Sequence, residues 1–230
     1  MNVVIFGATG MVGQAALRAC LSDTGVAQAL AVGRTPTGRS HPKLRELVRE
    51  NLFDYSGIEP DLTGYDACFF CLGVTSSGMD EASYTKLTYD LTLAAATILS
   101  RLNPAMTFVY VSGAGTDSSE KGRVMWARVK GRTENALQRL PFKAVYLFRP
   151  GIIQPLHGIQ SKTRAYRIFY AWTGPVLTAL RAIAPRRVLT TDGIGKAMIA
   201  VARSGAPKAV LESSDLHAIA LTGSIHATRT

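Results

Sequence analysis

Three glycines spaced three residues apart follow the first apolar run of the chain, and they constrain the fold more than any other feature. The sequence VVIFGATGMVGQAA places them between a predicted strand at residues 2–7 and a predicted helix at residues 11–22. Glycines in this context permit a tight turn, a close approach of the backbone to a pyrophosphate and close packing of the helix on the strand. The helix N-terminus adds free N–H groups. The sequence therefore predicts a dinucleotide-binding turn made of Gly7, Thr9, Gly10, Met11, Val12 and Gly13.

Short apolar runs alternate with helical patterns along the rest of the chain, as in parallel sheets covered by helices on both faces. Further strands are predicted at 27–34, 45–51, 66–73, 106–113 and 143–151, and further helices at 81–101, 124–139 and 192–203. This pattern predicts an α/β fold, a doubly wound parallel sheet of the NAD(P)-binding Rossmann type, with a small C-terminal substrate lobe. We expect residues 221–230, which are polar, to be frayed.

The length of 230 residues suits a single domain. Within it we expect a dinucleotide-binding core at 1–150, where the alternation is regular, and a substrate lobe with a C-terminal helix at 151–230. The second part is expected to line the substrate pocket, because loops beyond the carboxyl ends of parallel strands form the crevice of such folds.

The end of the second predicted strand bears on the choice between NAD and NADP. An acidic residue there binds the ribose 2′-hydroxyl of NAD, whereas an arginine accommodates the 2′-phosphate of NADP. The stretch AVGRTPTGR has Arg34 and no carboxylate, so we expect NADP as the cofactor. Asn51, after the third strand, is a candidate acceptor for the adenine amino group, with Asp54 as its competitor; capping of a turn is the alternative role for both.

Several motifs together resemble one family. These are GATGMVG at the N-terminus, FFCLGVT and YVSGAG on two strands, VKGRTE on a helix and FRPGII on a further strand. They resemble the atypical short-chain dehydrogenase/reductase superfamily, in the branch of the Tat-interacting-protein-like oxidoreductases. The resemblance implies that Leu72 and Gly73 lie beside the adenosine-side ribose and that Pro150 and Gly151 lie near the nicotinamide.

In that family a serine, a tyrosine and a lysine act together, and the tyrosine stands four residues before the lysine. The resemblance implies that Ser112 and Lys130 are the serine and the lysine. The tyrosine position holds Trp126, whose indole N–H is a donor that does not titrate in the useful pH range. His157, Tyr166 and Tyr170 are candidates for a relocated acid.

The replacement of the family's tyrosine by Trp126 leaves two possible functions. The first is an NADP(H)-dependent oxidoreductase without the usual tyrosine, acting on a small molecule of quinone-like or aromatic type that needs no strong acid. The alternative is a non-catalytic NADP(H)-binding regulatory or assembly protein. The fold does not separate the two, because function depends on the site.

Charge and cysteine usage set the remaining expectations. A net charge of +10 favours an anionic partner, and we expect a phosphorylated cofactor rather than nucleic acid. The basic segment 164–187 is compatible with peripheral membrane contact at most, because its apolar run at 168–184 is interrupted and short for a spanning helix. Cys68 and Cys71 are expected to be reduced core thiols rather than metal ligands. No export signal is visible at the N-terminus, so we expect a cytoplasmic protein.

Overall fold

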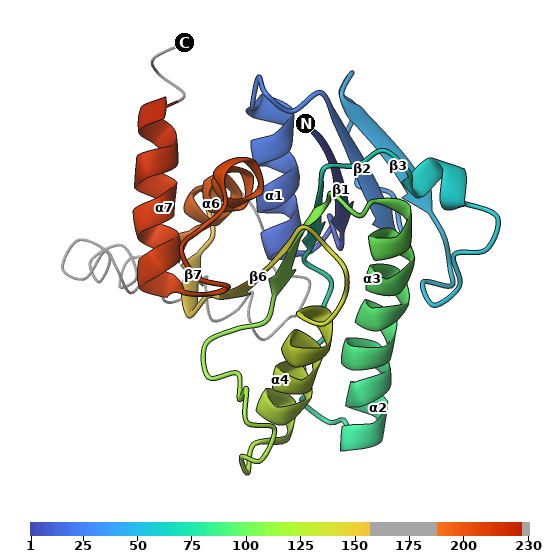
Figure 1. Cartoon of the computed structure of the whole chain (residues 1–230), viewed down its shortest axis with the longest axis vertical. Helices are drawn as coiled ribbons and strands as arrows, with labels where there is room; N and C mark the ends of the chain where they lie inside the picture. Colours follow the sequence, from blue (N-terminus) through green and yellow to red (C-terminus); the bar gives the residue numbers. More distant parts are fainter. Residues whose placement is uncertain (157–187, 227–230) are drawn as a thin grey trace.

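A seven-stranded parallel sheet forms the centre of the computed structural model, which describes residues 1–156 and 188–226 (Figure 1). The strands pair in the order β3-β2-β1-β4-β5-β6-β9, and every neighbouring pair is parallel. Chain order reverses between β1 and β4, the position at which doubly wound sheets form a binding crevice. The strands are β1 Asn2–Phe6, β2 Gln28–Gly33, β3 Leu44–Val48, β4 Ala67–Phe70, β5 Thr107–Val111, β6 Ala144–Arg149 and β9 Val210–Glu212.

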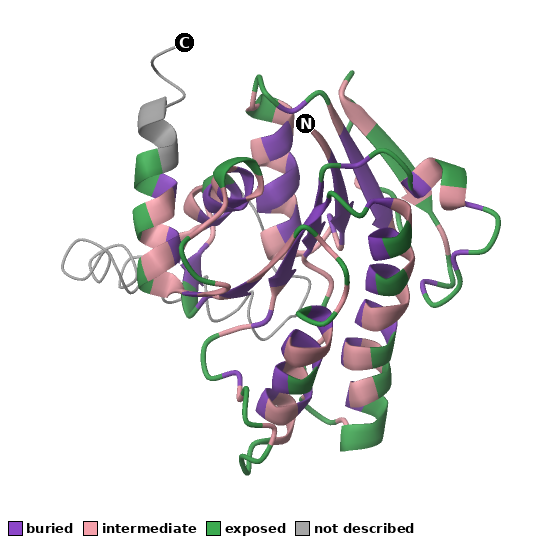
Figure 2. Cartoon of the chain, in the orientation of Figure 1, coloured by how far each residue is buried: buried purple, intermediate pink, exposed green. Residues whose placement is uncertain are grey.

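The central strands of the sheet are buried on both faces, which explains why they are continuous apolar runs. Side chains of β1 alternate between the two faces: Val3 and Ile5 belong to one core, and Val4 and Phe6 to the other. All four are fully buried, and Figure 2 shows the central strands as the most buried part of the chain. On the second face Phe6 stacks on Phe70 with ring centroids 5.2 Å apart, so aromatic contacts reinforce the pairing of β1 with β4.

Two groups of helices cover the two faces (Figure 1). Helix α1 packs on α6, and α6 packs on α7. On the other face, α4 packs on α2 and α3. The bounds are α1 Met11–Ser22, α6 Thr191–Ser204 and α7 Ser213–His226 for the first group, and η1 Glu59–Leu62, α2 Glu81–Thr85, α3 Leu91–Leu102 and α4 Met125–Leu137 for the second.

The helix predicted at 81–101 contains a π-helical turn, η2 Lys86–Asp90, between α2 and α3. Asp80 caps its start, because its side chain accepts a hydrogen bond from Ser83 N at 2.7 Å. The turn packs against α4, and Tyr89 within it lies under the guanidinium of Arg132, 4.5 Å from the ring centroid. Single π-helical turns are common near functional sites, and this one supports the helix that carries Lys130.

The prediction of a doubly wound parallel sheet is confirmed. The C-terminal part differs in detail from the prediction. Strand β9 joins the sheet beside β6 and α6 packs on α1, so these described elements after residue 150 pack on the same core as the elements before it. A two-stranded parallel pair, β7 Ile152–Gln154 and β8 Val188–Thr190, lies outside the main sheet. The expectation of a frayed end from 221 is wrong for 221–226, which are part of α7.

Candidate functional site

The residues predicted for the cofactor site gather at the carboxyl edge of the sheet. Each follows the end of a strand or begins the helix after it, and parallel strands bring these ends to one edge. They are Gly7, Thr9, Gly10, Met11, Val12 and Gly13 after β1, Arg34 after β2, Asn51 after β3, Leu72 and Gly73 after β4, Ser112 after β5 and Pro150 after β6.

The glycine turn after β1 has no room for side chains at two of its three glycines. Gly7 has a φ of +76°, and a Cβ there would lie 2.8 Å from the backbone of Leu72. A Cβ on Gly13 would lie 2.0 Å from the carbonyl oxygen of Gly7, so α1 packs directly on the turn. Gly10 is the N-cap of α1, and neither a capping side chain nor an acidic residue occupies its first turn. The helix N-terminus is therefore suited to an anion.

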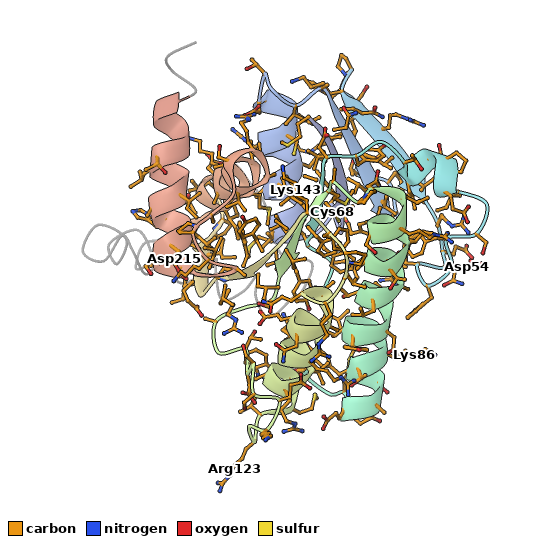
Figure 3. The ribbon with its side chains drawn as sticks, viewed as in Figure 1. Asp54, Cys68, Lys86, Arg123, Lys143 and Asp215 are labelled. Carbon is orange, nitrogen blue, oxygen red and sulfur yellow. The ribbon has the colours of Figure 1, made fainter. Side chains whose placement is uncertain are left out.

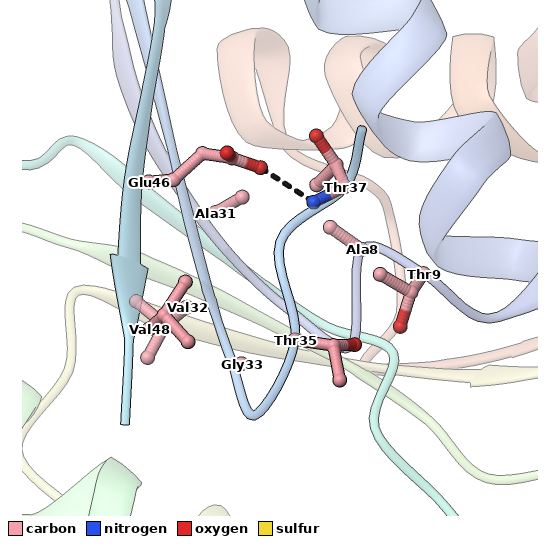
Figure 4. Close-up of a pocket in the computed structure, with 9 residues that line it drawn as sticks. All are labelled: Ala8, Thr9, Ala31, Val32, Gly33, Thr35, Thr37, Glu46 and Val48. Atoms are coloured by element: carbon pink, nitrogen blue, oxygen red, sulfur yellow. Dashed lines mark hydrogen bonds between the residues drawn. The ribbon is translucent and has the colours of Figure 1, made fainter. Parts of the chain in front are cut away.

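A pocket beside this turn is lined by residues of the turn, of β2 and of β3 (Figure 4). Thr9 lines it from the turn, Gly33 and Thr35 from the end of β2, and Glu46 from β3. The carboxylate of Glu46 accepts a hydrogen bond from Thr37 N at 2.6 Å, which holds the loop after β2. The sequence has no carboxylate at the end of β2, but the neighbouring strand supplies one to the same pocket.

Asn51 and Asp54 both cap turns. The side chain of Asn51 accepts a hydrogen bond from Phe53 N at 2.9 Å. Asp54 accepts two hydrogen bonds from Ser56, and Figure 3 shows it on the outer loop after β3. The hydrogen bonds from Ser56 lower the pKa of Asp54. The turn-capping role that the sequence left open is therefore present at both positions.

The loops that follow β4 and β6 form the next part of the edge. Leu72 packs against the core on the α3 face, whereas a Cβ on Gly73 would meet no atom within 4 Å. Pro150 is buried, and its carbonyl oxygen accepts a hydrogen bond from Ala114 N at 2.9 Å. Gly151 N donates to the hydroxyl of Ser213 at 2.8 Å, which connects the end of β6 with the start of α7.

Ser112, Lys130 and Trp126 lie close together, but the hydroxyl of Ser112 has an internal partner. It donates to Glu134 Oε1 at 2.6 Å, and Ser112 is only 7% exposed. The Lys130 ammonium donates to the backbone carbonyl of Ser112. Trp126 lies one turn before Lys130 on α4, and a Cβ on Gly115 would lie 3.6 Å from its ring. Lys130 therefore contacts the backbone carbonyl of Ser112 and not its hydroxyl, because the hydroxyl is bonded to the buried carboxylate of Glu134.

Burial of the amine lowers the pKa of Lys130 to about 8, and the charge of Glu134 acts in the opposite direction. A lysine whose folded pKa is lowered costs stability wherever the folded state holds its proton. This cost is fully present below pH 8 and disappears as the pH rises towards the unfolded value of about 10.4. Near neutral pH the site therefore holds a partly buried ammonium at the expense of stability.

Replacing Lys130 with methionine is expected to raise the free energy of unfolding at pH 7 by about 1–2 kcal/mol, a value reduced from the full pKa difference because the side chain is partly exposed. The gain should shrink at pH 10, where the parent lysine is neutral in the folded state. Chemical denaturation of both proteins at the two pH values measures it. A gain that is the same at pH 7 and pH 10 would contradict the assignment of the lowered pKa.

Three charged residues at this edge were not predicted from the sequence. Glu134 and Arg149 form a buried ion pair behind Ser112, and Glu46 lines the pocket beside β2. The spacing of Glu134 from Lys130, four residues on one helix, places both on one face and was a usable signal. Glu46 gave no such signal, because its contact with Thr37 depends on how β3 pairs with β2.

The cysteines lie in the core. Cys68 is fully buried in the middle of the sheet (Figure 3), and burial raises its pKa well above the ordinary value. Cys20 is also fully buried, and burial raises its pKa to about 12. In the described part of the chain, no three His, Cys, Asp or Glu side chains lie together as metal ligands would.

Other sequence predictions fall elsewhere. His157, Tyr166, Tyr170 and the basic segment 164–187 lie outside the described residues. Among the residues that are described, no helix is both long and apolar enough to cross a membrane.

The parallel sheet and the glycine turn define a Rossmann fold of the NAD(P)-binding type. No family model matches the chain. Over 206 residues it is 29% identical to the mitochondrial protein fmp52 of Emericella nidulans, covering 86% of this chain and 85% of that protein. It is 25% identical to protein HTATIP2 of Rattus norvegicus over 155 residues, covering 66% of this chain and 62% of that protein. These relatives confirm the predicted resemblance to the atypical short-chain dehydrogenases/reductases and their Tat-interacting-protein-like branch.

Solved structures with the same fold include sugar-nucleotide enzymes. A UDP-N-acetylglucosamine 4-epimerase of Methanobrevibacter ruminantium, in complex with UDP-N-acetylmuramic acid, superposes with a TM-score of 0.68 at 16% identity, covering 92% of this chain and 75% of that one. The enzyme WbmF of Bordetella bronchiseptica, in complex with NAD+, superposes with a TM-score of 0.66 at 16% identity, covering 100% and 79%. At this identity they establish the fold alone.

The comparisons correct the expected location. Several relatives, from Emericella nidulans, Aspergillus oryzae and other fungi, are named as mitochondrial proteins. The prediction of a cytoplasmic protein, which rested on the lack of a visible export signal, is therefore wrong.

Proposed function

We propose that this protein is an NADP(H)-dependent oxidoreductase that lacks the tyrosine acid of its relatives. The observation that carries the proposal is the glycine turn, in which the Cβ positions of Gly7 and Gly13 are filled by backbone. Such a turn brings main-chain N–H groups and the start of α1 to the place where a pyrophosphate binds in this fold. WbmF, with the same fold, is known in complex with NAD+, which supports a nicotinamide dinucleotide as the ligand.

The residues at the edge of the sheet divide among the parts of the dinucleotide. Gly7, Gly10 and Gly13, with the first turn of α1, would hold the pyrophosphate. The pocket beside β2 would take the adenosine ribose, with Asn51 toward the adenine and Leu72 and Gly73 beside the ribose. Lys130 would bind the nicotinamide ribose, and Pro150 would border the nicotinamide. The remaining residues proposed for this site are Thr9, Met11, Val12, Arg34 and Ser112.

The pocket beside β2 carries opposing charges toward a 2′-phosphate. Arg34 follows β2 directly and is exposed, whereas the Glu46 carboxylate lines the pocket from β3. Arginine favours a phosphate through charge-assisted hydrogen bonds, and a carboxylate repels it. We infer that NADP is preferred because of Arg34 and that Glu46 limits the preference.

Replacing Arg34 with alanine is expected to weaken NADPH binding by about 1.5–3 kcal/mol, the usual value of a hydrogen bond to a charged group, and to leave NADH binding nearly unchanged. The physical reason is that only NADPH carries the 2′-phosphate. Calorimetric titration of both cofactors with parent and variant measures the difference. An equal loss for both cofactors would show that Arg34 does not read the phosphate.

The same titrations with Glu46→Gln should give the opposite result, a gain in NADPH affinity. The amide keeps the hydrogen-bond acceptor for Thr37 N and removes the negative charge. NADPH binding should tighten by several-fold, with little change for NADH. Tightening of both cofactors, or of neither, would exclude Glu46 from the selection.

The chemistry available to the chain's own groups limits the acceptor. The nicotinamide supplies the hydride when it is bound. Trp126 offers a flat apolar face and an indole N–H that does not titrate near neutral pH. Lys130, whose burial lowers its pKa to about 8, is the titratable group at this position. We therefore propose an acceptor that needs no strong acid from the enzyme, of quinone-like or aromatic type.

The position of Trp126 also favours one alternative, a non-catalytic NADP(H)-binding protein with a regulatory or assembly role. NADPH oxidation by purified protein, measured with a panel of quinones, flavins and small carbonyls, separates the two. The oxidoreductase predicts turnover with members of the quinone or flavin set. Tight NADPH binding without turnover on any acceptor would favour the alternative, and a lack of dinucleotide binding would refute both.

A further inference from the structure

A buried carboxylate lies directly behind the Ser112–Lys130 contact. Glu134 is 0% exposed and lies one helical turn after Lys130 on α4. Its Oε1 accepts hydrogen bonds from the Ser112 hydroxyl at 2.6 Å and from Arg149 Nε at 3.1 Å, and its Oε2 accepts from Arg149 Nη2. A charged residue without solvent exposure is uncommon and requires pairing of this kind.

The ion pair of Glu134 and Arg149, with the two serines bonded to it, connects four segments around the site: α4, β6, the end of β5 and the loop before α4. Glu134 belongs to α4, Arg149 to the end of β6 and Ser112 to the end of β5. Arg149 Nη2 also bonds the Ser118 hydroxyl at 2.5 Å, in the loop that leads into α4. The bidentate ion pair between Arg149 and Glu134 fixes both the rotation and the depth of α4 against the sheet, because a planar guanidinium binds a carboxylate in only a narrow range of orientations. Lys130, one turn earlier, is thereby held at the Ser112 carbonyl.

Glu134 also acts on Lys130 through its charge. Burial lowers the pKa of Lys130 and the negative charge of Glu134 raises it. Around them, Tyr84 on α2 and Tyr110 on β5 are buried, and burial raises the pKa of both. Arg128 is paired with Glu81 on α2, and hydrogen bonds from Ser119 and Gly122 lower the pKa of Asp117 in the loop before α4.

We propose that Glu134 is a positioning residue: paired with Arg149, it holds α4 at the depth at which Lys130 reaches the Ser112 carbonyl, and it places a carboxylate one helical turn from the Lys130 ammonium. Glu134 therefore extends the range of pH over which Lys130 can act as a cation toward the cofactor ribose. This inference rests on the proposed function, since it concerns the same site. Its test is chosen to work without a bound cofactor.

The test is a pH titration of the Lys130 amine by NMR in the full chain labelled at lysine Cε, with Lys130→Met to assign the signal. The parent should titrate near pH 8. In Glu134→Gln the midpoint should fall by about one pH unit, because an opposite charge that favoured the protonated form is gone. NADPH affinity, measured from pH 6 to 9, should fall with rising pH in both proteins, and should do so at lower pH in the variant.

Two further variants make the result decisive. Glu212→Gln is the matched control, because Glu212 also faces Arg149, at 3.7 Å, but is 46% exposed and belongs to β9; it should leave the Lys130 midpoint unchanged. Glu134→Gln combined with Arg149→Gln leaves no unpaired buried charge, so it serves if the single variant does not fold. An unchanged Lys130 midpoint in the Glu134 variants would overturn the proposal. If NADPH does not bind to the parent at any pH, the proposed function fails, but the NMR titration still decides the role of Glu134.

Discussion

Replacing Gly131 with alanine is expected to lower the free energy of unfolding by about 2–4 kcal/mol, despite a gain of roughly 1 kcal/mol in helix propensity. Gly131 is buried in the middle of α4, next to Lys130. A Cβ there would lie 1.7 Å from the carbonyl oxygen of Asp117 and 3.1 Å from Ser118 N. Both are backbone atoms of the loop before α4, which is tied to the helix by a hydrogen bond from Asp117 N to Ala127 O. The loop must therefore move outward as a unit.

Thermal unfolding measures this loss, and a protein of this length should melt about 5–15 °C lower. Gly73→Ala is the control, because a Cβ on Gly73 meets no atom within 4 Å and the residue has no positive φ. It should change the melting temperature little. A Gly131 variant as stable as the Gly73 variant would show that the loop does not pack on α4 as described. The movement should also weaken the Lys130 contact with Ser112, so NADPH binding should fall with stability.

The sheet could be predicted from the sequence because its strands are buried on both faces. Continuous apolar runs such as those of β1 and β4 identify such strands without any long-range information. The glycine turn was equally accessible, since the positive φ of Gly7 and the close approach of Gly13 to Gly7 both lie within one strand-turn-helix unit. Local constraints of this kind can be read from a few adjacent residues of the sequence. Strand β9, with three residues, was too short to give such a pattern.

The direction of side chains at the site could not be predicted in the same way. The resemblance implied that Ser112 acts together with Lys130, but the Ser112 hydroxyl donates to Glu134, 22 residues later. Glu46 lines the pocket beside β2 because β3 pairs with that strand. Both contacts depend on how separate elements pack, and residue type alone carries little information about that. The charged groups that determine the electrostatics of a site are therefore the part that most needs the structure.

Replacing Trp126 with tyrosine is expected to raise the rate of small-carbonyl reduction by about 10²-fold, the lower end of the contribution of general acid catalysis. A phenol one turn before Lys130 would restore a titratable proton donor, and the nearby ammonium would lower its pKa. The lower end is expected because the Ser112 hydroxyl is held by Glu134 and is not free to orient the carbonyl. A Cβ on Gly115 would lie 3.6 Å from the indole ring of Trp126, so the residue that faces this part of the ring has no side chain.

The comparison is NADPH oxidation by the parent, Trp126→Tyr, Trp126→Phe and Trp126→Tyr with Lys130→Ala. Phenylalanine changes the ring without adding a hydroxyl, so it should stay as slow as the parent, and the loss of Lys130 should remove most of the gain from tyrosine. Quinone reduction should change much less than carbonyl reduction, because a quinone accepts hydride without a strong acid from the enzyme. A parent that already reduces small carbonyls as fast as its tyrosine variant would mean that another group supplies the proton, and that Trp126 does not restrict the acceptor.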